Sequence, residues 1–325
     1  MTAKDNTGTK RPLIILTGPT AVGKTALSIG LAKAIQGEII SADSMQVYRG
    51  MDIGTAKITK KQMDGVPHHL IDIMDPSDSF HVMAFQQKCK EAMEDIYARH
   101  KIPILVGGTG FYIQSVLYDI SFTETDTDIE YRQKLQKIAE EQGGYVLHAR
   151  LAKIDPEAAD EIHPNNVKRV IRALEFNHQT GEKISIHNEQ ERQKKSPYQF
   201  RYYVLSLPRE ILYDRINRRV DVMRRDGLVD EVKGLLQQGI TPNMVSMQGL
   251  GYKEIIDALQ GSCSFEEAFE RIKRETRHFA KRQFTWFRRE RDVTWIDKET
   301  YENEDAILRY MIDDLKNAHI LPADQ

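Results

Sequence analysis

The 325-residue chain has only two cysteines, only two tryptophans and almost no net charge. Cys89 and Cys263 lie far apart and have no C-x-x-C companion, so the sequence indicates neither a disulfide framework nor a zinc site. No apolar run approaches the roughly twenty residues that a membrane helix needs, and the polar start MTAKDNTGTK lacks the apolar core of a signal peptide. We therefore expect a cytoplasmic protein with no membrane partner.

Positive charge is concentrated in one late segment of the chain. The formal net charge is -2, yet residues 271–291 contain nine Lys or Arg against two Glu. Aromatic residues such as Phe279, Phe284 and Trp286 alternate with these cations, a combination that suits a nucleic-acid backbone and its bases. The aromatics also recur near helical spacing and fit the core face of a helix. Both interpretations can hold if the apolar stripe faces inward and the cations outward.

A glycine-rich stretch near the start, GPTAVGKT, matches the G-x-x-x-x-G-K-[ST] pattern of a phosphate-binding loop. A buried strand is expected before it at 12–17 and an amphipathic helix after it at 25–35, so the helix N-terminus would face the anion. The phosphate loop comprises Gly18, Pro19, Thr20, Ala21, Val22, Gly23, Lys24 and Thr25. Lys24 would add a positive charge and Thr25 would hold Mg²⁺, the expected cofactor.

Short β-rich runs alternate with helical patterns in the first third, which predicts an α/β fold: a P-loop NTPase-like parallel sheet flanked by helices. The runs fall at 12–17, 37–42, 68–73 and 102–108, and a final strand is expected at 202–207. The sequence between the runs at 102–108 and 202–207 is polar and has helical patterns. It predicts an inserted all-helical subdomain at 121–200, because structureless connections of that length are rare. The core would comprise 1–120 and 201–325, with helices from 209 onward.

Four further residues are candidates for chemistry, and two of them follow the carboxyl ends of strands, where open parallel sheets bind ligands. Asp43 follows the second run, either as a carboxylate that steadies magnesium or as a general base beside a polyphosphate. Thr109 lies in a second glycine turn, GGTGFY, and could contact substrate. Arg215 and Arg219 share one face of a helix while Arg218 points elsewhere, and one of the pair is expected to reach a leaving phosphate.

Seven stretches, in this order, resemble the tRNA dimethylallyltransferases of bacteria: GPTAVGKT, ISADSMQVYRGMDIGTAK, VGGTGFY, VKRVIRALE, RRV, GLGYKE and AKRQFTWFR. They span nearly the whole chain. The resemblance implies transfer of a dimethylallyl group from dimethylallyl diphosphate to the exocyclic amine of the adenosine next to the anticodon of a tRNA. The phosphate loop would then hold the diphosphate leaving group. We expect the enzyme to act as a monomer on the anticodon stem-loop.

The resemblance also assigns roles. Asp43, Thr109 and Arg219 match catalytic positions, with Asp43 as the base, while Thr20, Lys24 and Thr25 would stabilise the diphosphate. The positions that match tRNA contacts are Asp43, Ser44, Met45, Gln46, Thr109, Arg132, Val167, Lys168, Arg169, Gln248, Gly249, Leu250, Gly251, Tyr252, Lys281, Arg282 and Gln283. From the residues alone two alternatives stay open: a small-molecule kinase that uses ATP, and a tRNA-binding switch driven by nucleotide hydrolysis.

Overall fold

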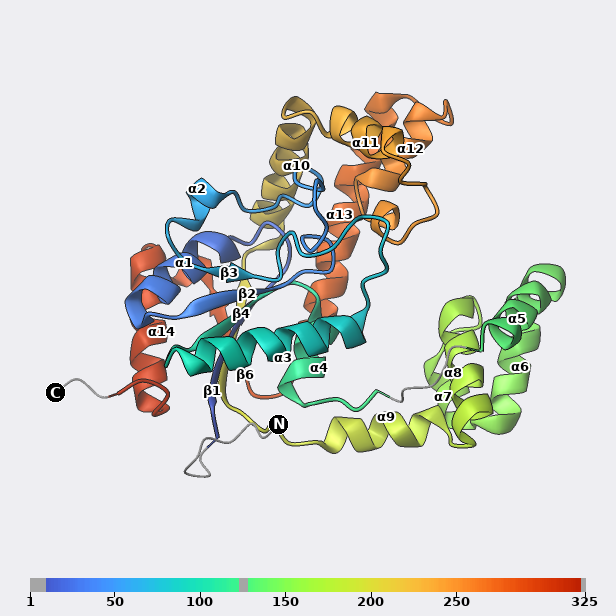
Figure 1. Ribbon diagram of the computed structural model, residues 1–325, viewed down its shortest axis with the longest axis horizontal. Helices are drawn as coiled ribbons and strands as arrows, with labels where there is room; N and C mark the ends of the chain where they lie inside the picture. The colour runs from blue at the N-terminus through green and yellow to red at the C-terminus, as the bar shows by residue number, and fades with distance from the viewer. Residues whose placement is uncertain (1–9, 123–127, 323–325) are drawn as a thin grey trace. The chain divides into compact units, whose positions relative to one another are not determined.

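The computed structural model describes residues 10–122 and 128–322 (Figure 1). The chain divides into two compact units, one formed by Met1–Leu117 with Pro197–Gln325 and the other by Tyr118–Ser196. The second unit therefore starts three residues before, and ends four residues before, the insertion expected at 121–200. The C-terminal boundary of the second unit lies before the expected one because β5 (Gln199–Ser206), the strand that returns to the first unit, begins at Gln199.

The first unit is built on one six-stranded sheet with the order β3-β2-β4-β1-β5-β6, and its neighbouring strands are parallel. The predicted α/β class is confirmed. The strands are β1 Pro12–Thr17, β2 Glu38–Ala42, β3 His68–His69, β4 Pro103–Gly107, β5 Gln199–Ser206 and β6 Val293–Asp297. Leu13 to Leu16 in β1 and Tyr202 to Leu205 in β5 are fully buried, as expected of strands covered on both faces.

Two expectations about strands were wrong. The run 68–73 forms only the two-residue β3, because Leu70 and Asp72 adopt left-handed backbone angles, with φ of 61° and 56°, which end the extended conformation. The strand at 202–207 is not the last one, since β6 follows it at the edge of the sheet. Only Ile296 of β6 is buried, so this strand lacks the continuous apolar run by which buried strands are recognised.

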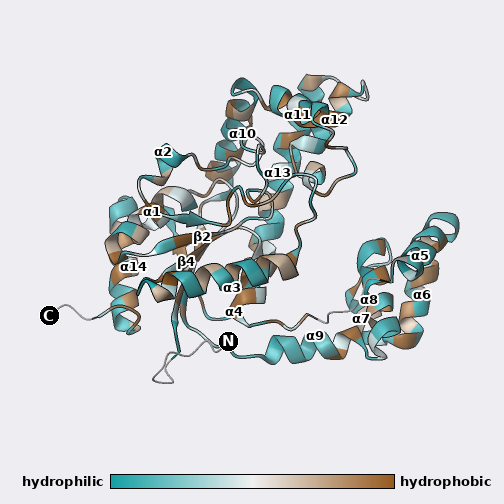
Figure 2. Cartoon of the chain, in the orientation of Figure 1, coloured by the Kyte–Doolittle hydropathy of each residue, from teal (hydrophilic) through white to brown (hydrophobic). Residues whose placement is uncertain are grey.

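Helices cover both faces of the sheet. The first unit contains α1 Lys24–Ile35, α2 Lys60–Met63, α3 Val82–Ala98, α4 Gly110–Leu117, α10 Arg209–Arg225, α11 Leu228–Gln237, α12 Tyr252–Leu259, α13 Phe265–Phe287 and α14 Glu304–Asn317, with 3-10 turns at Ser246–Gln248 and Lys298–Thr300. Figure 2 shows the hydrophobic residues of β2 and β4 between these more polar helices. Within the described residues, no helix is both long and apolar enough to cross a bilayer.

The chain reverses its direction across the sheet between β1 and β4. From β1 it crosses through α1 to β2, whereas from β4 it passes through α4 and later re-enters on the other side of β1, at β5. Because such crossovers are right-handed, α1 and α4 lie on opposite faces of the sheet, with α14 beside α1 and α13 beside α4 (Figure 1). Reversal of this kind opens a crevice at the carboxyl ends of the two strands.

The second unit consists of helices with their own core. They are α5 Ile129–Gln142, α6 Gly144–Ile154, α7 Pro156–Glu161, α8 Val167–Thr180 and α9 Ile184–Gln193. Leu135, Leu147, Leu151 and Val170 are among the buried side chains of this core. The buried Asp155 caps α7 by accepting from the Ala158 N–H, and it also accepts from the amide and hydroxyl of Ser185. This carboxylate therefore joins α7 to α9.

A buried carboxylate at the start of β2 should contribute measurably to stability. Glu38 is 2% exposed, and its oxygens lie 2.7 Å from Arg99 Nη2, 3.0 Å from Lys101 Nζ and 2.8 Å from His69 Nε2. Burial raises the pKa of this carboxyl, but the hydrogen bonds from Arg99, His69 and Lys101 outweigh that effect and lower the pKa to about 2.

We expect Glu38→Gln to lower the free energy of unfolding at pH 7 by about 1.5 to 3 kcal/mol. Because the pKa is depressed in the folded state, this contribution is complete above the unfolded value of about 4.5 and is lost as the pH falls toward 2. Urea unfolding of both proteins between pH 7 and pH 3 measures the difference, with the exposed Glu91→Gln on α3 as control. A difference that does not shrink as the pH falls would contradict this assignment.

Candidate active site

Three loops meet at the carboxyl ends of β1, β2 and β4. Thr17 pairs with Gly107, and Gly107 pairs with Ala42 on its other side, so the residues that follow these strands lie close together. Two hydrogen bonds fix the junction, from Thr17 Oγ1 to the Gly107 carbonyl at 2.6 Å and from the Thr109 N–H to the Ala42 carbonyl at 3.2 Å. A Cβ at Gly107 would lie 2.2 Å from the Ala42 carbonyl oxygen, which is why the second glycine turn needs glycine here.

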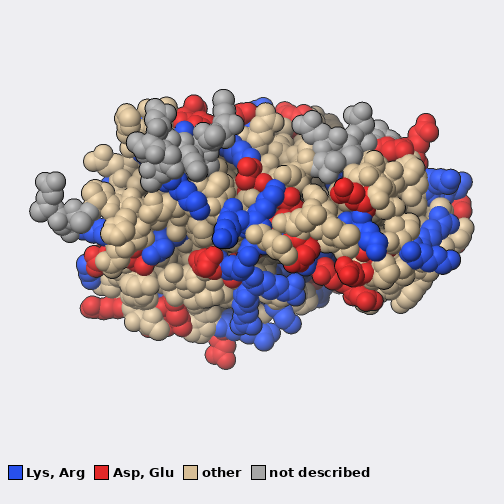
Figure 3. All heavy atoms as spheres, turned by 90° about the horizontal axis from the view of Figure 1, so that it is seen from below, with Lys and Arg blue, Asp and Glu red and all other residues tan. Residues whose placement is uncertain are grey.

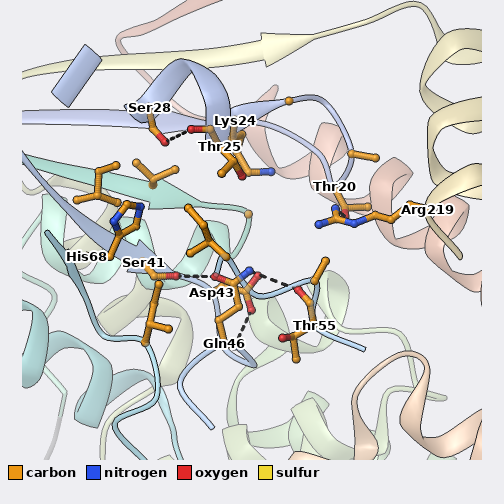
Figure 4. A pocket seen from close by; sticks show the side chains of 18 of the residues that line it. Thr20, Lys24, Thr25, Ser28, Ser41, Asp43, Gln46, Thr55, His68 and Arg219 are labelled. Atoms are coloured by element: carbon orange, nitrogen blue, oxygen red, sulfur yellow. Dashed lines mark hydrogen bonds between the residues drawn. The ribbon is translucent and has the colours of Figure 1, made fainter. Parts of the chain in front are cut away.

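These loops surround a cavity of about 380 Å³. One end is cationic and polar, with Lys24, Thr25, Arg215 and Arg219, while Asp43 and Gln46 lie across from the phosphate loop (Figure 4). The apolar part of the wall consists of Ile39, Ile58, Ile71, Val106 and Phe279. The cavity thus offers a place for an anion, a carboxylate near that place, and an apolar surface beside both.

Lys24 is turned back onto its own loop. Its Nζ donates to the carbonyls of Gly18 and Pro19, both at 2.9 Å. Burial lowers the pKa of this ammonium to about 7, the charge of Arg219 acts in the same direction, and Asp43 opposes them. An anion in the cavity would supply the negative charge that this buried ammonium lacks.

Arg219 reaches the phosphate loop from α10. Its Nη1 donates to Thr20 Oγ1 at 3.3 Å, and Figure 4 shows the guanidinium directed at Thr20. Arg215 also lines the cavity, so both members of the predicted pair lie at this site. Arg218 instead pairs with Asp214 at 2.9 Å and is 78% exposed, as its place on the helix predicts. Burial lowers the pKa of Arg219, with Asp43 acting in the opposite direction.

Gln283 joins the two glycine loops from the side. It lies on α13 and is buried, its Oε1 accepts from the Thr20 N–H at 2.9 Å, and its Nε2 donates to the Gly108 carbonyl at 3.0 Å. The phosphate loop and the GGTG turn are therefore held at a fixed distance by one side chain of the basic helix. A contact between Gln283 and tRNA stays a prediction, but both ends of this amide are already used within the protein.

Asp43 is held by the backbone that follows it. Its Oδ1 accepts from the N–H groups of Met45 at 2.8 Å and Gln46 at 3.3 Å. Among the described residues, no group donates a hydrogen bond to Oδ2. One oxygen of the carboxylate is thus fixed while the other stays able to accept a proton.

The basic segment forms one helix with an apolar face inward and cations outward, as expected, while its binding of nucleic acid stays a prediction. On α13, Ala268, Phe269, Ile272, Ala280 and Phe287 are buried, whereas Arg274, His278, Lys281, Arg282 and Trp286 are exposed. Within the described residues, the side chain of Lys281 has no ion-pair partner, and Arg282 makes only a cation–π contact with Phe279. Figure 3 shows a face on which Lys and Arg side chains gather in a band.

The other predicted residues lie outside the cavity wall. Thr109 stands directly after the lining Gly108, and Ser44 and Met45 follow Asp43. Met45 packs against the predicted tRNA segment 248–252, since a Cβ on Gly249 would lie 2.5 Å from Met45 Cε. In the second unit, Lys168 and Arg169 are exposed, and Arg132 forms a two-pronged ion pair with the buried Glu175 at 2.6 and 2.8 Å.

Sequence reasoning missed several residues of this wall. Thr55 and Ala56 lie in the GMDIGTAK stretch, which was noted for the resemblance but given no site role. His68 lines the cavity, while its neighbour His69 pairs with Glu38. The apolar residues of the wall carry no separate signal, because Ile39 and Val106 look like ordinary members of buried strands. Their common location is a product of the fold.

Comparison with known proteins agrees with this site. A family model described as IPP transferase matches residues 46–290, and a model described as isopentenyl transferase matches residues 12–79. The tRNA dimethylallyltransferase of Lachnoclostridium phytofermentans is 57% identical over 311 residues, which cover 96% of this chain and 99% of the relative. The enzyme of the same name from a Bacillus cereus strain is 51% identical over 302 residues, covering 93% of this chain and 95% of the relative.

Solved structures agree as well. The tRNA isopentenylpyrophosphate transferase of Bacillus halodurans superposes with a TM-score of 0.71 and 47% identity, covering 96% of this chain and 99% of that one. A eukaryotic dimethylallyltransferase acting on tRNA superposes with a TM-score of 0.79 and 32% identity, covering 97% of this chain and 81% of that one. The phosphate loop, the carboxylate opposite it and the full-length matches lead to one conclusion: this chain belongs to the tRNA dimethylallyltransferase family.

Proposed function

We propose that this enzyme transfers a dimethylallyl group from dimethylallyl diphosphate to the exocyclic amine of the adenosine 3′ of the anticodon in tRNA. One observation carries the proposal: Asp43, Lys24 and Arg219 line the same cavity, and part of its wall is formed by the apolar side chains of Ile39, Ile58, Ile71, Val106 and Phe279. A diphosphate, a prenyl chain and a proton acceptor can therefore share one site.

The residues of the cavity account for the leaving group and the proton of the transfer reaction. The amine nitrogen of adenosine attacks the allylic carbon of the donor, the bond from that carbon to the diphosphate oxygen breaks, and the amine proton passes to Asp43. The neutral amine is a weak nucleophile, so a positioned base and alignment must supply much of the rate. The Met45 and Gln46 amides hold Oδ1 of Asp43, which leaves Oδ2 to take the proton.

The leaving diphosphate fits the cationic end of the cavity. The α1 helix begins at Lys24, so its amide groups and dipole favour an anion at the phosphate loop, and Lys24 and Arg219 add two charges. The Thr25 hydroxyl is a hard oxygen donor of the kind that Mg²⁺ accepts, with diphosphate oxygens and water able to complete the shell. When bound, the ion would neutralise charge on the diphosphate.

The simplest test incubates the purified protein with labelled dimethylallyl diphosphate and an unmodified anticodon stem-loop. We expect label on the stem-loop carrying adenosine at the target position and none on a matched stem-loop carrying guanosine there. A kinase would instead consume ATP and leave the stem-loop unlabelled. Lack of transfer to the adenosine stem-loop by a folded, magnesium-supplied protein would refute the proposal.

The exposed cations of α13 are proposed to bind the tRNA backbone. Replacing Lys281 and Arg282 together by alanine should weaken tRNA binding and flatten its salt dependence, because each lost phosphate contact removes about 0.7 to 0.9 from the slope of log K against log salt. Filter binding at several salt concentrations measures the slope. The matched control replaces Lys60 and Lys61, two exposed lysines of α2. If both double variants bind tRNA with the same slope of log K against log salt, α13 does not belong to the tRNA interface.

A further inference from the structure

A loop between β2 and α2 forms part of the cavity wall without belonging to any strand or helix. Thr55, Ala56 and Ile58 of this loop line the cavity. The loop turns back on itself: the Lys57 N–H donates to the Asp52 carbonyl at 2.8 Å, and the Ala56 N–H donates to the Ile53 carbonyl at 3.0 Å. These local bonds give the loop its shape but do not attach it to the rest of the protein.

The loop is attached at Lys57, whose Nζ pairs with Asp72 at 2.6 Å, and at residues 52–54 by one carboxylate on α11. Glu231 Oε2 accepts from the N–H groups of Asp52 at 2.9 Å and Ile53 at 2.7 Å, and its Oε1 accepts from the N–H of Gly54 at 3.0 Å. Three successive amides of the loop thus converge on a single anionic side chain, 177 to 179 residues away in sequence. Hydrogen bonds to a charged acceptor are roughly twice as strong as neutral ones.

Tyr252 completes this arrangement from α12. Its hydroxyl donates to Glu231 Oε1 at 2.7 Å, and the residue is only 1% exposed. The ring packs on the loop so closely that a Cβ at Gly54 would lie 2.6 Å from its carbon atoms. Burial and the Glu231 carboxylate raise the pKa of this phenol, so it remains a donor. The acceptor, the loop amides and the ring therefore form one compact contact.

A chain of hydrogen bonds runs from this loop to Asp43. Gln46 Nε2 donates to the Thr55 carbonyl at 3.3 Å, and Gln46 Oε1 accepts from Ser41 Oγ at 3.2 Å. The backbone N–H of the same Gln46 donates to Asp43 Oδ1 at 3.3 Å. Figure 4 shows Ser41, Gln46, Thr55 and Asp43 in this arrangement. Displacing the loop would release one end of the Gln46 side chain and loosen the carboxylate beside it.

We propose that Glu231 is a positioning residue for the transfer reaction, which holds the loop 52–54 and, through Thr55 and Gln46, the carboxylate of Asp43. This inference rests on the proposed function. Glu231 does not itself line the cavity and, on this account, does not touch the substrate. It acts on the turnover step because it aligns the base, whereas the phosphate loop that receives the donor is held separately by Gln283 and Arg219.

The test compares Glu231→Gln with Asp230→Asn. Glutamine keeps the size of the side chain but places an N–H₂ donor where an oxygen now faces donors. Asp230 is the adjacent carboxylate of α11, its side chain is 84% exposed, and its replacement makes the same charge change away from the loop. We expect Glu231→Gln to lower kcat by about 10- to 100-fold, with the KM for dimethylallyl diphosphate within about twofold of wild type.

Hydrogen exchange gives a readout independent of activity. In Glu231→Gln the amides of residues 52–54 should exchange at least about tenfold faster, while those of β1 stay unchanged. Glu231→Asp retains the charge on a shorter chain, so its kcat should lie between those of wild type and Glu231→Gln. If Glu231→Gln does not fold, a joint loss of protection at 52–54 and of kcat in Glu231→Asp supports the proposal.

The outcomes separate the two proposals. If wild type transfers no label to the stem-loop, the proposed function fails. The positioning role is refuted if wild type and Asp230→Asn are active and Glu231→Gln has the same kcat as wild type. This kcat is measured at a temperature well below the thermal unfolding midpoint of Glu231→Gln. The positioning role is also refuted if exchange at 52–54 is unchanged, or if the loss lies wholly in the KM for the donor.

Discussion

Asp43→Asn is expected to lower the kcat for prenylation of the anticodon stem-loop by about 10²- to 10⁴-fold, the usual contribution of a positioned general base. Asparagine keeps the oxygen that accepts from the Met45 and Gln46 N–H groups, so the local backbone should be preserved. It cannot take the amine proton at neutral pH. Single-turnover kinetics with saturating donor and stem-loop measure the effect on the chemical step.

Binding should change little in the same variant. Inorganic diphosphate affinity by calorimetry and stem-loop affinity by filter binding are expected to stay within a few-fold of wild type, because Lys24, Arg219 and the α13 cations are untouched. The exposed Asp95→Asn on α3 is the matched control. A loss below tenfold would show that Asp43 is not the base. A loss reversed by raised magnesium would favour the alternative that Asp43 mainly steadies the ion.

Lys24→Ala is expected to lower kcat/KM for the donor by about 10²- to 10³-fold, because it removes a cation at the site where leaving-group charge develops. Diphosphate affinity should fall as well, since Lys24 belongs to the loop that receives the anion. Lys33→Ala is the control: it lies on the same helix, and its side chain forms an ion pair with Asp64 at the surface. Equal activity in the two variants would exclude Lys24 from the donor site.

The pH dependence of diphosphate binding tests the same residue in the wild type. Lys24 has a pKa of about 7 in the free protein, and a bound anion favours its charged form and raises that pKa. Binding should therefore take up protons increasingly as the pH rises from 6 to 8, and affinity should fall over this range. Calorimetry in buffers of different ionisation enthalpy measures the uptake. Diphosphate itself also exchanges protons on binding, and the same measurement on Lys24→Ala corrects for this. The proton uptake due to Lys24 must be absent in that variant.

The sequence predicted the parts of the site that are local in the chain. The phosphate loop depends on glycines at fixed spacing between a buried run and a helix, and these signals lie within 25 residues of one another. The position of Asp43 near that loop followed from the rule that ligands bind at the carboxyl ends of parallel strands. The location of Arg215 and Arg219 on one face of a helix followed from helical periodicity alone. The first and third inferences use only neighbours along the chain, and the second adds one general rule about parallel sheets.

Other features could not be predicted because they depend on contacts between distant segments. The edge strand β6 buries only Ile296, so its pattern does not distinguish it from a loop. The resemblance assigns Gln283 to the tRNA contacts, and no local pattern indicates that its amide also bonds to Thr20 and Gly108 within the protein. No sequence pattern around Glu231 indicates that its carboxylate accepts hydrogen bonds from the amides of residues 52–54.

The sequence by itself determined the α/β class, the anion-binding loop, the candidate base and the concentration of positive charge on one helix. Periodicity, glycine spacing and charge are properties of short segments, so they can be read without coordinates. Only the tertiary structure decided which side chains hold those parts in place, namely Gln283 between the two glycine loops and Glu231 beneath the cavity wall. Hydrogen bonds between segments more than a hundred residues apart follow from how helices pack around the sheet, and no local pattern encodes that packing.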